Sequence, residues 1–203
     1  MILQDIERYY RFHAGIYDVT RWSFLFGRAK LIQKIVSHSV PSHILEIGCG
    51  TGKNLVNLCH YLPQAKCVGL DISEDMLRQA RKNLNAYLSR IEFLHRTYDR
   101  PVKAEPAFDL ILFSYSLSMM PKDWESAIEY AQQDLRPGGL IAVVDFNDSS
   151  FSWFKRWMEL NHVRMDGHLL PRLQSSFRSV KLEINHAYGG LWNYFLFIGR
   201  TEM

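Results

Sequence analysis

The stretch of sequence that decides the fold is Glu46–Gly52, which reads EIGCGTG. An apolar run over residues 43–47 leads into it, and a helical pattern over residues 54–61 follows it. Glycines at such a place let the backbone turn tightly and let a ligand touch the main chain without a Cβ in the way. In doubly wound sheets, ligands bind outside the carboxyl ends of the strands, where this first turn opens. The stretch therefore predicts a ligand-binding turn of an α/β protein.

Strand and helix patterns alternate after this turn. The further strands are expected over residues 67–70, 91–94, 109–113 and 140–145, and the helices over residues 54–61, 73–88 and 124–135. Ser73, followed by two acids, is suited to cap its helix. Pro137-Gly138-Gly139 predicts a turn that ends one helix and begins the next strand. Such alternation predicts a mostly parallel sheet with helices on both faces.

The two ends of the chain depart from this alternation. Residues 180–184 and 192–198 read as strands around a glycine turn at 188–190, which predicts an antiparallel hairpin, and residues up to about 35 have helical spacing. We therefore expect one domain over residues 1–203. It combines an N-terminal helical lid (1–38) with a Rossmann-like, doubly wound, mostly parallel core (39–203) that ends in the antiparallel hairpin.

Composition is consistent with a cytoplasmic α/β domain. The 203 residues are 47% hydrophobic with a formal net charge of +3, and no apolar run approaches the roughly 18 residues of a membrane span. Cys49, Cys59 and Cys67 form no CxxC pair, so we expect reduced thiols inside the core.

Two ligands compete for the glycine turn. Asp71 ends the second expected strand, where a carboxylate accepts hydrogen bonds from a ribose diol. A dinucleotide fingerprint would need a glycine where Lys53 stands, and Glu46 would repel a pyrophosphate. The same glutamate suits the cationic amino group of S-adenosylmethionine. The alternative without a ligand is a plain strand–helix turn with Asp71 as a solvated cap.

Together with the runs at 108–114 and 135–139, Glu46–Gly52 and Asp71 resemble the class I S-adenosylmethionine-dependent methyltransferases. The resemblance implies this cofactor, with S-adenosylhomocysteine as product. It places the glycines at the methionine part, Asp71 at the ribose and Ile72 at the adenine. Thr97 stands where many relatives carry an aspartate, which leaves the Tyr98 N–H for the adenine amine. The expected cofactor-binding residues are Glu46, Gly48, Cys49, Gly50, Gly52, Asp71, Ile72, Thr97, Tyr98 and Ser114.

Several acceptor classes leave marks that this sequence lacks. Residues 113–117 read FSYSL, without the Pro-Pro-aromatic run of enzymes that methylate base amino groups. Ser114 and Tyr115 are poor ligands for a hard cation, so we expect no metal. No basic run interleaved with aromatics predicts a nucleic-acid partner. Amines, hydroxyls and activated carbons of small molecules or lipids remain.

Residues 9–28 are rich in aromatic side chains. Tyr10, Tyr17 and Arg21 share one face of a helix, and tyrosine rings can surround a cationic nitrogen or can simply pack on the sheet. Residues 22–26, like residues 151–157, combine aromatic and basic side chains as interfacial anchors do, although core packing is the alternative.

The same residues 9–28 resemble the start of the N-methyltransferase that completes betaine-lipid synthesis in bacteria. The resemblance implies trimethylation of diacylglyceryl-homoserine at the inner membrane face, with the enzyme that makes this lipid as a partner. Phosphatidylethanolamine N-methyltransferases, and a small-molecule methyltransferase, are the alternatives.

Methyl transfer to an amine needs a held lone pair and a group that takes a proton. Tyr17 and His168 are the candidate catalytic residues, with His168 expected in a loop between the last helix and the hairpin. The candidate substrate-binding residues are Tyr10, Asp18, Arg21, Tyr115 and Asp145. Asp145 either orients the amine or caps its strand, and His168 is otherwise a surface histidine. An oxidoreductase and a cofactor-binding subunit without catalysis are the alternatives from other classes.

Overall fold

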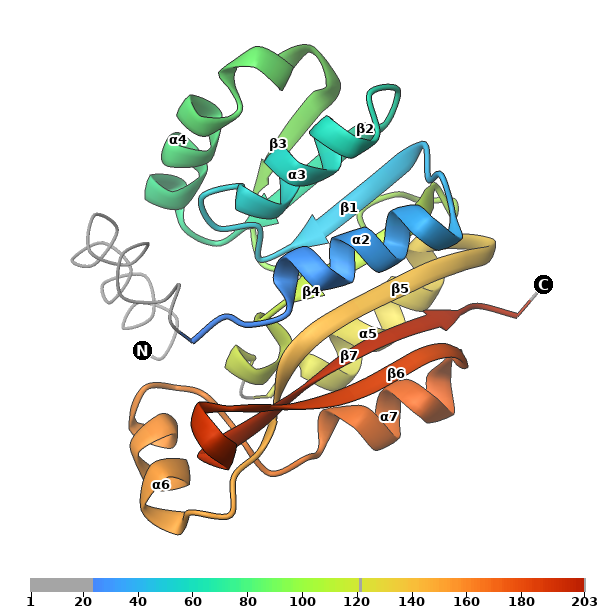
Figure 1. Ribbon diagram of the computed structural model, residues 1–203. Coiled ribbons are helices and arrows are strands. Elements are labelled where there is room, and N and C mark those ends of the chain that lie inside the picture. Colours follow the sequence, from blue (N-terminus) through green and yellow to red (C-terminus); the bar gives the residue numbers. More distant parts are fainter. Residues whose placement is uncertain (1–23, 121, 203) are drawn as a thin grey trace. The chain divides into compact units, whose positions relative to one another are not determined.

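The computed structural model describes residues 24–120 and 122–202, and its seven strands belong to one mixed sheet. The chain divides into two units, Met1–Thr97 and Tyr98–Met203, which Figure 1 colours from blue to green and from green to red. Tyr10, Tyr17, Asp18 and Arg21 lie outside the described residues, as does most of the expected helical lid.

In the first unit, three parallel strands lie in the order β3-β2-β1. The strands are β1 (His43–Ile47), β2 (Lys66–Asp71) and β3 (Ile91–His95), and the helices are α2 (Arg28–His38), α3 (Lys53–Tyr61), α4 (Glu74–Asn83) and the 3-10 helix η1 (Asn85–Arg90). Four of the five residues of β1 and five of the six of β2 are buried, as parallel strands covered on both faces require. Helix α2 packs beside α3, and α4 packs on β2 and β3.

Helix α4 begins as the sequence predicts and ends earlier. Ser73 caps it, because its hydroxyl accepts a hydrogen bond from the Met76 N–H at 3.4 Å. The predicted helix over residues 73–88 stops at Asn83 and continues as η1. Arg90, at the end of η1, donates to the carbonyl oxygens of Cys59, Leu62 and Ala65 at 2.9–3.2 Å. Its guanidinium thereby satisfies carbonyls where α3 ends, a place at which a cation is favourable.

In the second unit, the strands lie in the order β4-β5-β7-β6. The strands are β4 (Phe108–Ser114), β5 (Leu135–Asp148), β6 (Arg178–Ala187) and β7 (Trp192–Arg200), and the helices are α5 (Trp124–Asp134), α6 (Ser152–Leu160), α7 (Leu169–Ser176) and the 3-10 helices η2 (Leu117–Met119) and η3 (Tyr188–Gly190). Strands β4 and β5 are parallel, whereas β7 runs antiparallel to both β5 and β6. The predicted C-terminal hairpin is thus confirmed, and Figure 1 shows it as the red ribbons beside β5.

Two boundaries in this unit differ from the prediction. Strand β5 begins directly after α5, at Leu135, so that Pro137-Gly138-Gly139 lies within an irregular part of the strand. Gly138, at φ 74°, allows this irregularity, and the register with β4 shifts there. The sequence patterns also predicted neither α6 nor α7, which follow β5 and precede the hairpin.

The fold is therefore the predicted Rossmann-like α/β fold. All three cysteines are buried free thiols, as expected. No helix among the described residues is long and apolar enough to cross a membrane.

Candidate functional site

In the first unit, the glycine turn follows the carboxyl end of β1 and is hydrogen-bonded to the carboxyl end of β2. The N–H groups of Gly48 and Cys49 both donate to the Leu70 carbonyl, at 2.8 and 3.0 Å. Gly48, Gly50 and Gly52 all have positive φ, at 70°, 54° and 77°. Side chains other than glycine rarely adopt this conformation, so the three glycines are needed for the path of the turn.

Asp71, at the end of β2, stabilises this turn through hydrogen bonds. Its Oδ2 accepts a hydrogen bond from the Gly50 N–H at 2.7 Å, and its Oδ1 accepts one from the Ser73 N–H at 2.9 Å. The carboxylate is buried, and burial raises its pKa, against the opposing effect of these backbone N–H donors. Each carboxylate oxygen can accept a second hydrogen bond, so Asp71 can still bind a hydroxyl pair.

Glu46 lies at the other side of the turn and is almost completely buried. Its Oε1 accepts a hydrogen bond from Asn54 Nδ2 at 2.6 Å, and Asn54 Oδ1 in turn accepts one from Arg28 Nε at 3.2 Å. Burial raises the pKa of Glu46 to about 7, although Asn54 and the charge of Arg28 act in the opposite direction. Glu46 Oε2 is buried and has no hydrogen-bond partner among the described residues.

The residues of the turn fit S-adenosylmethionine. A buried carboxylate oxygen without a partner is costly, and a cationic amino group would satisfy both its charge and its lone pairs. A Cβ built on Gly50 meets no atom within 4 Å, so there is open space beside the main chain at this residue. By contrast, a Cβ on Gly52 would lie 2.6 Å from Leu84 Cδ1, because the turn packs tightly against the end of α4.

The remaining residues that we expected to bind the cofactor differ in burial and in their contacts. The Cys49 side chain is buried, and burial raises the pKa of its thiol. Ile72 follows Asp71, and its carbonyl lies 3.0 Å from His95 Nε2. Thr97 is half-buried at the end of the first unit. The Tyr98 side chain points into the second unit instead, where its hydroxyl donates to Asp134 Oδ2 at 2.8 Å.

In the second unit, polar groups gather where β4 and β5 end. Asp145 is completely buried; its Oδ2 accepts from the Ser118 N–H at 3.1 Å and its Oδ1 from the Phe146 N–H at 2.8 Å. Burial raises the pKa of Asp145 to about 6, with hydrogen bonds from Ser118 opposing the shift. Strand β5 continues to Asp148, so Asp145 lies within the strand and not at its predicted end, and its two hydrogen bonds fix it to Ser118 and Phe146. A role of Asp145 in orienting the amine stays a prediction.

Ser114 and Tyr115 stand at the end of β4. Ser114 Oγ is buried without a hydrogen-bond partner among the described residues, and its predicted contact with the cofactor stays a prediction. Tyr115 has a positive φ of 57°, and its ring packs edge-on against Phe146 at 4.7 Å between centroids. A strained backbone at a strand end of this kind is common at functional sites.

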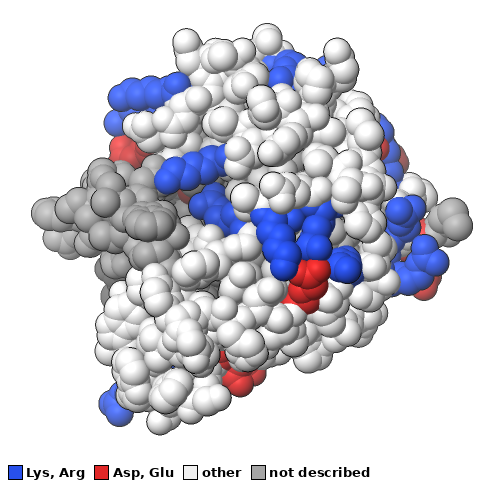
Figure 2. Space-filling view, in the orientation of Figure 1, with Lys and Arg blue, Asp and Glu red and all other residues white. Residues whose placement is uncertain are grey.

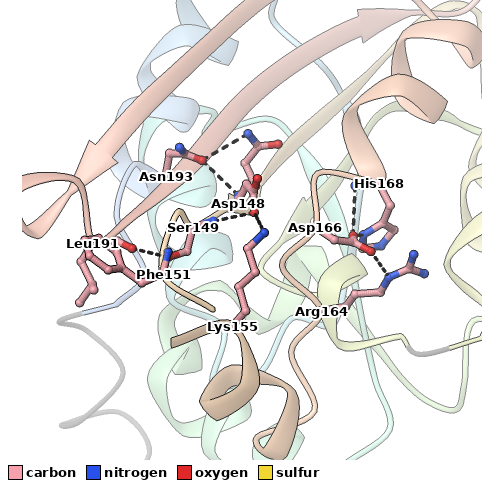
Figure 3. Close-up of polar contacts among 10 residues, drawn as sticks. Asp148, Ser149, Phe151, Lys155, Arg164, Asp166, His168, Leu191 and Asn193 are labelled. Atoms are coloured by element: carbon pink, nitrogen blue, oxygen red, sulfur yellow. Dashed lines mark hydrogen bonds and ion pairs between the residues drawn. The ribbon is translucent and has the colours of Figure 1, made fainter. Parts of the chain in front are cut away.

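His168 belongs to a hydrogen-bonded chain with Asp166 and Arg164, which Figure 3 shows with dashed lines. Its Nδ1 is hydrogen-bonded to Asp166 Oδ1, and Asp166 Oδ2 accepts from Arg164 Nε at 2.7 Å. Because a carboxylate only accepts, Nδ1 carries the proton and Nε2 keeps its lone pair. Burial lowers the pKa of His168, against the effect of Asp166, so the imidazole is neutral near pH 7.

The loop that carries His168 is tied to the ends of β5 and η2. The Gly167 N–H donates to the Asn147 carbonyl at 2.8 Å, and the Arg164 N–H donates to the Ser118 carbonyl at 3.0 Å. The Trp124 ring lies edge-on to the imidazole at 4.7 Å. His168 thus lies directly before α7, between α6 and α7. The expectation of a loop between the last helix and the hairpin was wrong, because α7 was not recognised.

Sequence reasoning missed several residues that hold these groups. Asn54 fixes Glu46, the Ser118 N–H fixes Asp145, and Asp166 orients His168. For Asp166 a signal existed, since it stands two residues before His168 and can reach it within one turn. For Asn54 and Ser118 the contact depends on chain folding that local patterns do not encode. No cluster of metal-ligating side chains occurs within residues 24–120 and 122–202.

The class I methyltransferase fold is defined by three features of this kind. They are a strand that leads into a glycine turn, an acid at the end of the next strand that binds this turn, and a mostly parallel sheet closed by an antiparallel hairpin. Residues 44–139 match the family described as the methyltransferase domain. Over these residues the chain is similar to methyltransferases, and its fold is the one that class I S-adenosylmethionine-dependent methyltransferases adopt.

Known proteins similar to this chain differ in what they act on. The biotin biosynthesis bifunctional protein BioCD of Bordetella avium is 32% identical over 152 residues, which cover 74% of this chain and 31% of that protein. The dTDP-3-amino-3,4,6-trideoxy-alpha-D-glucopyranose N,N-dimethyltransferase of Streptomyces venezuelae is 29% identical over 184 residues, covering 82% and 70%. The crystal structure of the N-methyltransferase NodS from Bradyrhizobium japonicum, in complex with S-adenosyl-L-homocysteine, has a TM-score of 0.73 at 21% identity, covering 87% and 86%. The chain thus aligns with less than a third of the length of the BioCD protein.

Proposed function

We propose that this protein transfers methyl groups from S-adenosylmethionine to an amine on a lipid head group, with diacylglyceryl-homoserine as the acceptor. The observation that carries the proposal is the Asp166–His168 pair, which presents a neutral imidazole suited to take a proton from an ammonium. Two proteins similar to this chain are N-methyltransferases by name. The choice of a lipid rests on the resemblance of residues 9–28.

The cofactor would be held by the first unit. Glu46 Oε2 would receive the amino group, the open side of Gly50 would accommodate the methionine part, and Asp71 would accept the ribose hydroxyls. Bound S-adenosylmethionine supplies an electrophilic methyl carbon on a sulfonium. The main work of the protein is then to hold a neutral amine in line with that carbon.

The second unit would prepare the amine. His168 Nε2 takes the proton of the substrate ammonium, and Asp166 holds the imidazole in the tautomer that this requires. Arg164, paired with Asp166, keeps the carboxylate ionised: burial alone would raise the pKa of Asp166, but the hydrogen bonds from Arg164 and His168 lower it. Tyr17 and Tyr10 are proposed to surround the cationic nitrogen, as suggested from their helical spacing.

Label transfer tests the proposal. The purified full chain is given methyl-labelled S-adenosylmethionine with detergent-dispersed diacylglyceryl-homoserine, with phosphatidylethanolamine, or with water-soluble amines. We expect label in the organic phase, with diacylglyceryl-homoserine preferred. Preference for phosphatidylethanolamine would favour the phospholipid alternative. Label confined to the aqueous phase would contradict a lipid acceptor and indicate a small-molecule methyltransferase.

Replacing His168 with alanine should reduce kcat about 100-fold, the usual contribution of a positioned base. Asp166→Asn should reduce kcat about tenfold, because the imidazole loses the partner that selects its tautomer. The affinity for S-adenosylmethionine should not change in either variant. Stopped assays across a pH series measure both effects, and the wild-type activity should fall with decreasing pH at values below the ordinary pKa of histidine.

The control for this experiment is His186→Ala, which removes an exposed histidine of β6 in the same unit. It should leave kcat and the pH profile unchanged. Added imidazole should restore part of the activity of His168→Ala but none to a variant that has merely lost its fold. A His168→Ala enzyme with the wild-type kcat would exclude this histidine as the base.

A further inference from the structure

Helix α6 and the adjacent η3 turn expose an unusual number of large apolar side chains. The exposed fractions are 45% for Phe151, 63% for Trp153, 46% for Trp157, 77% for Leu160 and 57% for Tyr188. We call these five residues the aromatic surface. Large exposed side chains that occur singly are ordinary, whereas a group of them on one helix and its neighbouring turn indicates an interaction site.

The aromatic surface stands on a rigid base. Phe154 and Trp192 are buried, and their rings stack at 5.3 Å between centroids. Trp157 stacks on Phe154 at 5.7 Å, and Tyr188 lies 5.0 Å from Trp192. The exposed rings of Trp157 and Tyr188 are therefore held in position by buried residues. They are exposed in the folded protein because each packs on a buried ring with one side only.

Hydrogen bonds fix the start of α6 to the η3 turn. Ser149 Oγ donates to the Leu191 carbonyl at 2.6 Å and accepts from the Phe151 N–H at 3.1 Å. Asp148 is bound to the Asn193 side chain through its own N–H and forms an ion pair with Lys155 (Figure 3). These contacts join the two parts of the aromatic surface into one piece.

The aromatic surface lies at the same edge of the second unit as His168. Helix α6 follows the carboxyl end of β5, and the loop that leaves α6 runs to Asp166 and His168. Two backbone hydrogen bonds connect that loop to the strand-end region, at Asn147 and Ser118. A bilayer that contacts the aromatic surface would therefore lie at the edge of the second unit that carries His168.

Shape and charge favour a lipid bilayer as the occupant. Tryptophan and tyrosine combine an apolar ring with a polar N–H or O–H and are enriched at membrane interfaces. The exposed Arg156 lies on the same helix beside Lys155, whose charge is paired with Asp148, and the chain carries a formal net charge of +3, which suits anionic head groups. Figure 2 shows few charged atoms on the lobe around α6, with cationic atoms at its tip.

We propose that the aromatic surface inserts into the head-group region of an anionic phospholipid bilayer and so brings the active edge of the second unit to its substrate. This deepens the proposed function, on which the choice of a lipid partner rests. Helix α6 would lie flat on the bilayer, since it is far too short to cross one.

Co-sedimentation with vesicles tests the inference. The full chain is mixed with vesicles of phosphatidylcholine and phosphatidylglycerol, and the bound fraction is measured for wild type and for the double variant Trp153→Ser/Trp157→Ser. We expect the partition coefficient to fall at least about tenfold, because two large apolar rings no longer leave water. The matched control, Val40→Ser/Tyr61→Ser, removes two exposed apolar side chains of the first unit and should bind as wild type does.

Both double variants should keep the wild-type affinity for S-adenosylmethionine and remain folded, as circular dichroism checks, although the loss of the Trp157 contact with Phe154 should lower the melting temperature of Trp153→Ser/Trp157→Ser. Equal vesicle binding by wild type and Trp153→Ser/Trp157→Ser would overturn the inference. So would a wild-type dimer that the same substitutions dissociate without vesicles, because the surface would then bind a second copy. Loss of vesicle binding in the double variant, together with label only in water-soluble amines, would uphold the inference and reject the proposed acceptor.

Discussion

Replacing Asp71 with alanine should lower the affinity for S-adenosylmethionine at least about 100-fold and abolish methyl transfer at ordinary cofactor concentrations. The carboxylate accepts hydrogen bonds from Gly50 and Ser73, so its removal leaves two N–H groups without their partner. These unpaired N–H groups destabilise the turn in the free and the bound protein alike. The affinity falls because the ribose hydroxyls lose a charged acceptor, at about 1.5–3 kcal/mol for each hydrogen bond. Every 1.4 kcal/mol corresponds to about a tenfold change in affinity.

Isothermal titration of the purified variant with S-adenosylmethionine measures this effect. Asp71→Asn should show a smaller loss, because the amide oxygen can still accept one of the two backbone hydrogen bonds. Asp75→Ala is the matched control, since Asp75 is a nearby acid in the first turn of α4 whose ion pair with Arg78 is partly exposed. Circular dichroism confirms that each variant is folded. An Asp71→Ala protein that is folded and binds the cofactor with wild-type affinity would refute the assigned role.

Replacing Glu46 with glutamine should have opposite effects on cofactor affinity and on stability. Affinity for S-adenosylmethionine should fall about 30-fold, because the buried oxygen that would receive the amino group no longer carries a charge. At the same time the free protein should become more stable at alkaline pH. The glutamine oxygen can still accept the hydrogen bond from Asn54 that Glu46 accepts.

The sign of the stability effect follows from the raised pKa of Glu46. In the folded protein the pKa is about 7 because of burial, against an ordinary value of 4.5. Between these two values the folded state retains a proton that the unfolded state has lost, so the free energy of unfolding decreases as pH rises through this window. At pH values above about 7, the buried carboxylate of the wild type is ionised, and its burial lowers the free energy of unfolding by about 3 kcal/mol. The neutral glutamine of the variant does not have this cost.

Urea denaturation at about pH 5 and about pH 8 measures this difference. The two proteins should be similar at the lower pH, and Glu46→Gln should be more stable by up to about 3 kcal/mol at the higher pH. Calorimetry in buffers of different ionisation enthalpy should also detect a proton released when the wild type binds S-adenosylmethionine near pH 6. A wild type whose stability and proton release do not depend on pH in this window would show that Glu46 is ionised throughout.

Local chemistry in the chain was sufficient for the order of the strands, for the glycine turn and for the hairpin, but not for helices α6 and α7. Buried parallel strands read as continuous apolar runs, Ser73 could be recognised as a cap, and only glycines suit the positive φ angles of the turn at 48–52. The adjacency of this turn and Asp71 also followed, because parallel strands bring their carboxyl ends to one edge of a sheet. These features depend on neighbours along the chain or on the general rules of α/β sheets.

Contacts between distant residues were decided only by the tertiary structure. Tyr98 was expected to serve the cofactor through its backbone, yet the fate of its side chain depends on Asp134, far along the sequence. The partnership of Asp145 with Ser118, and the position of His168 beside Trp124, likewise need strands and loops to be packed first. Burial, which sets the pKa of Glu46 and leaves the aromatic surface exposed, is a property of the packed molecule, because it depends on which side chains surround each group from every direction.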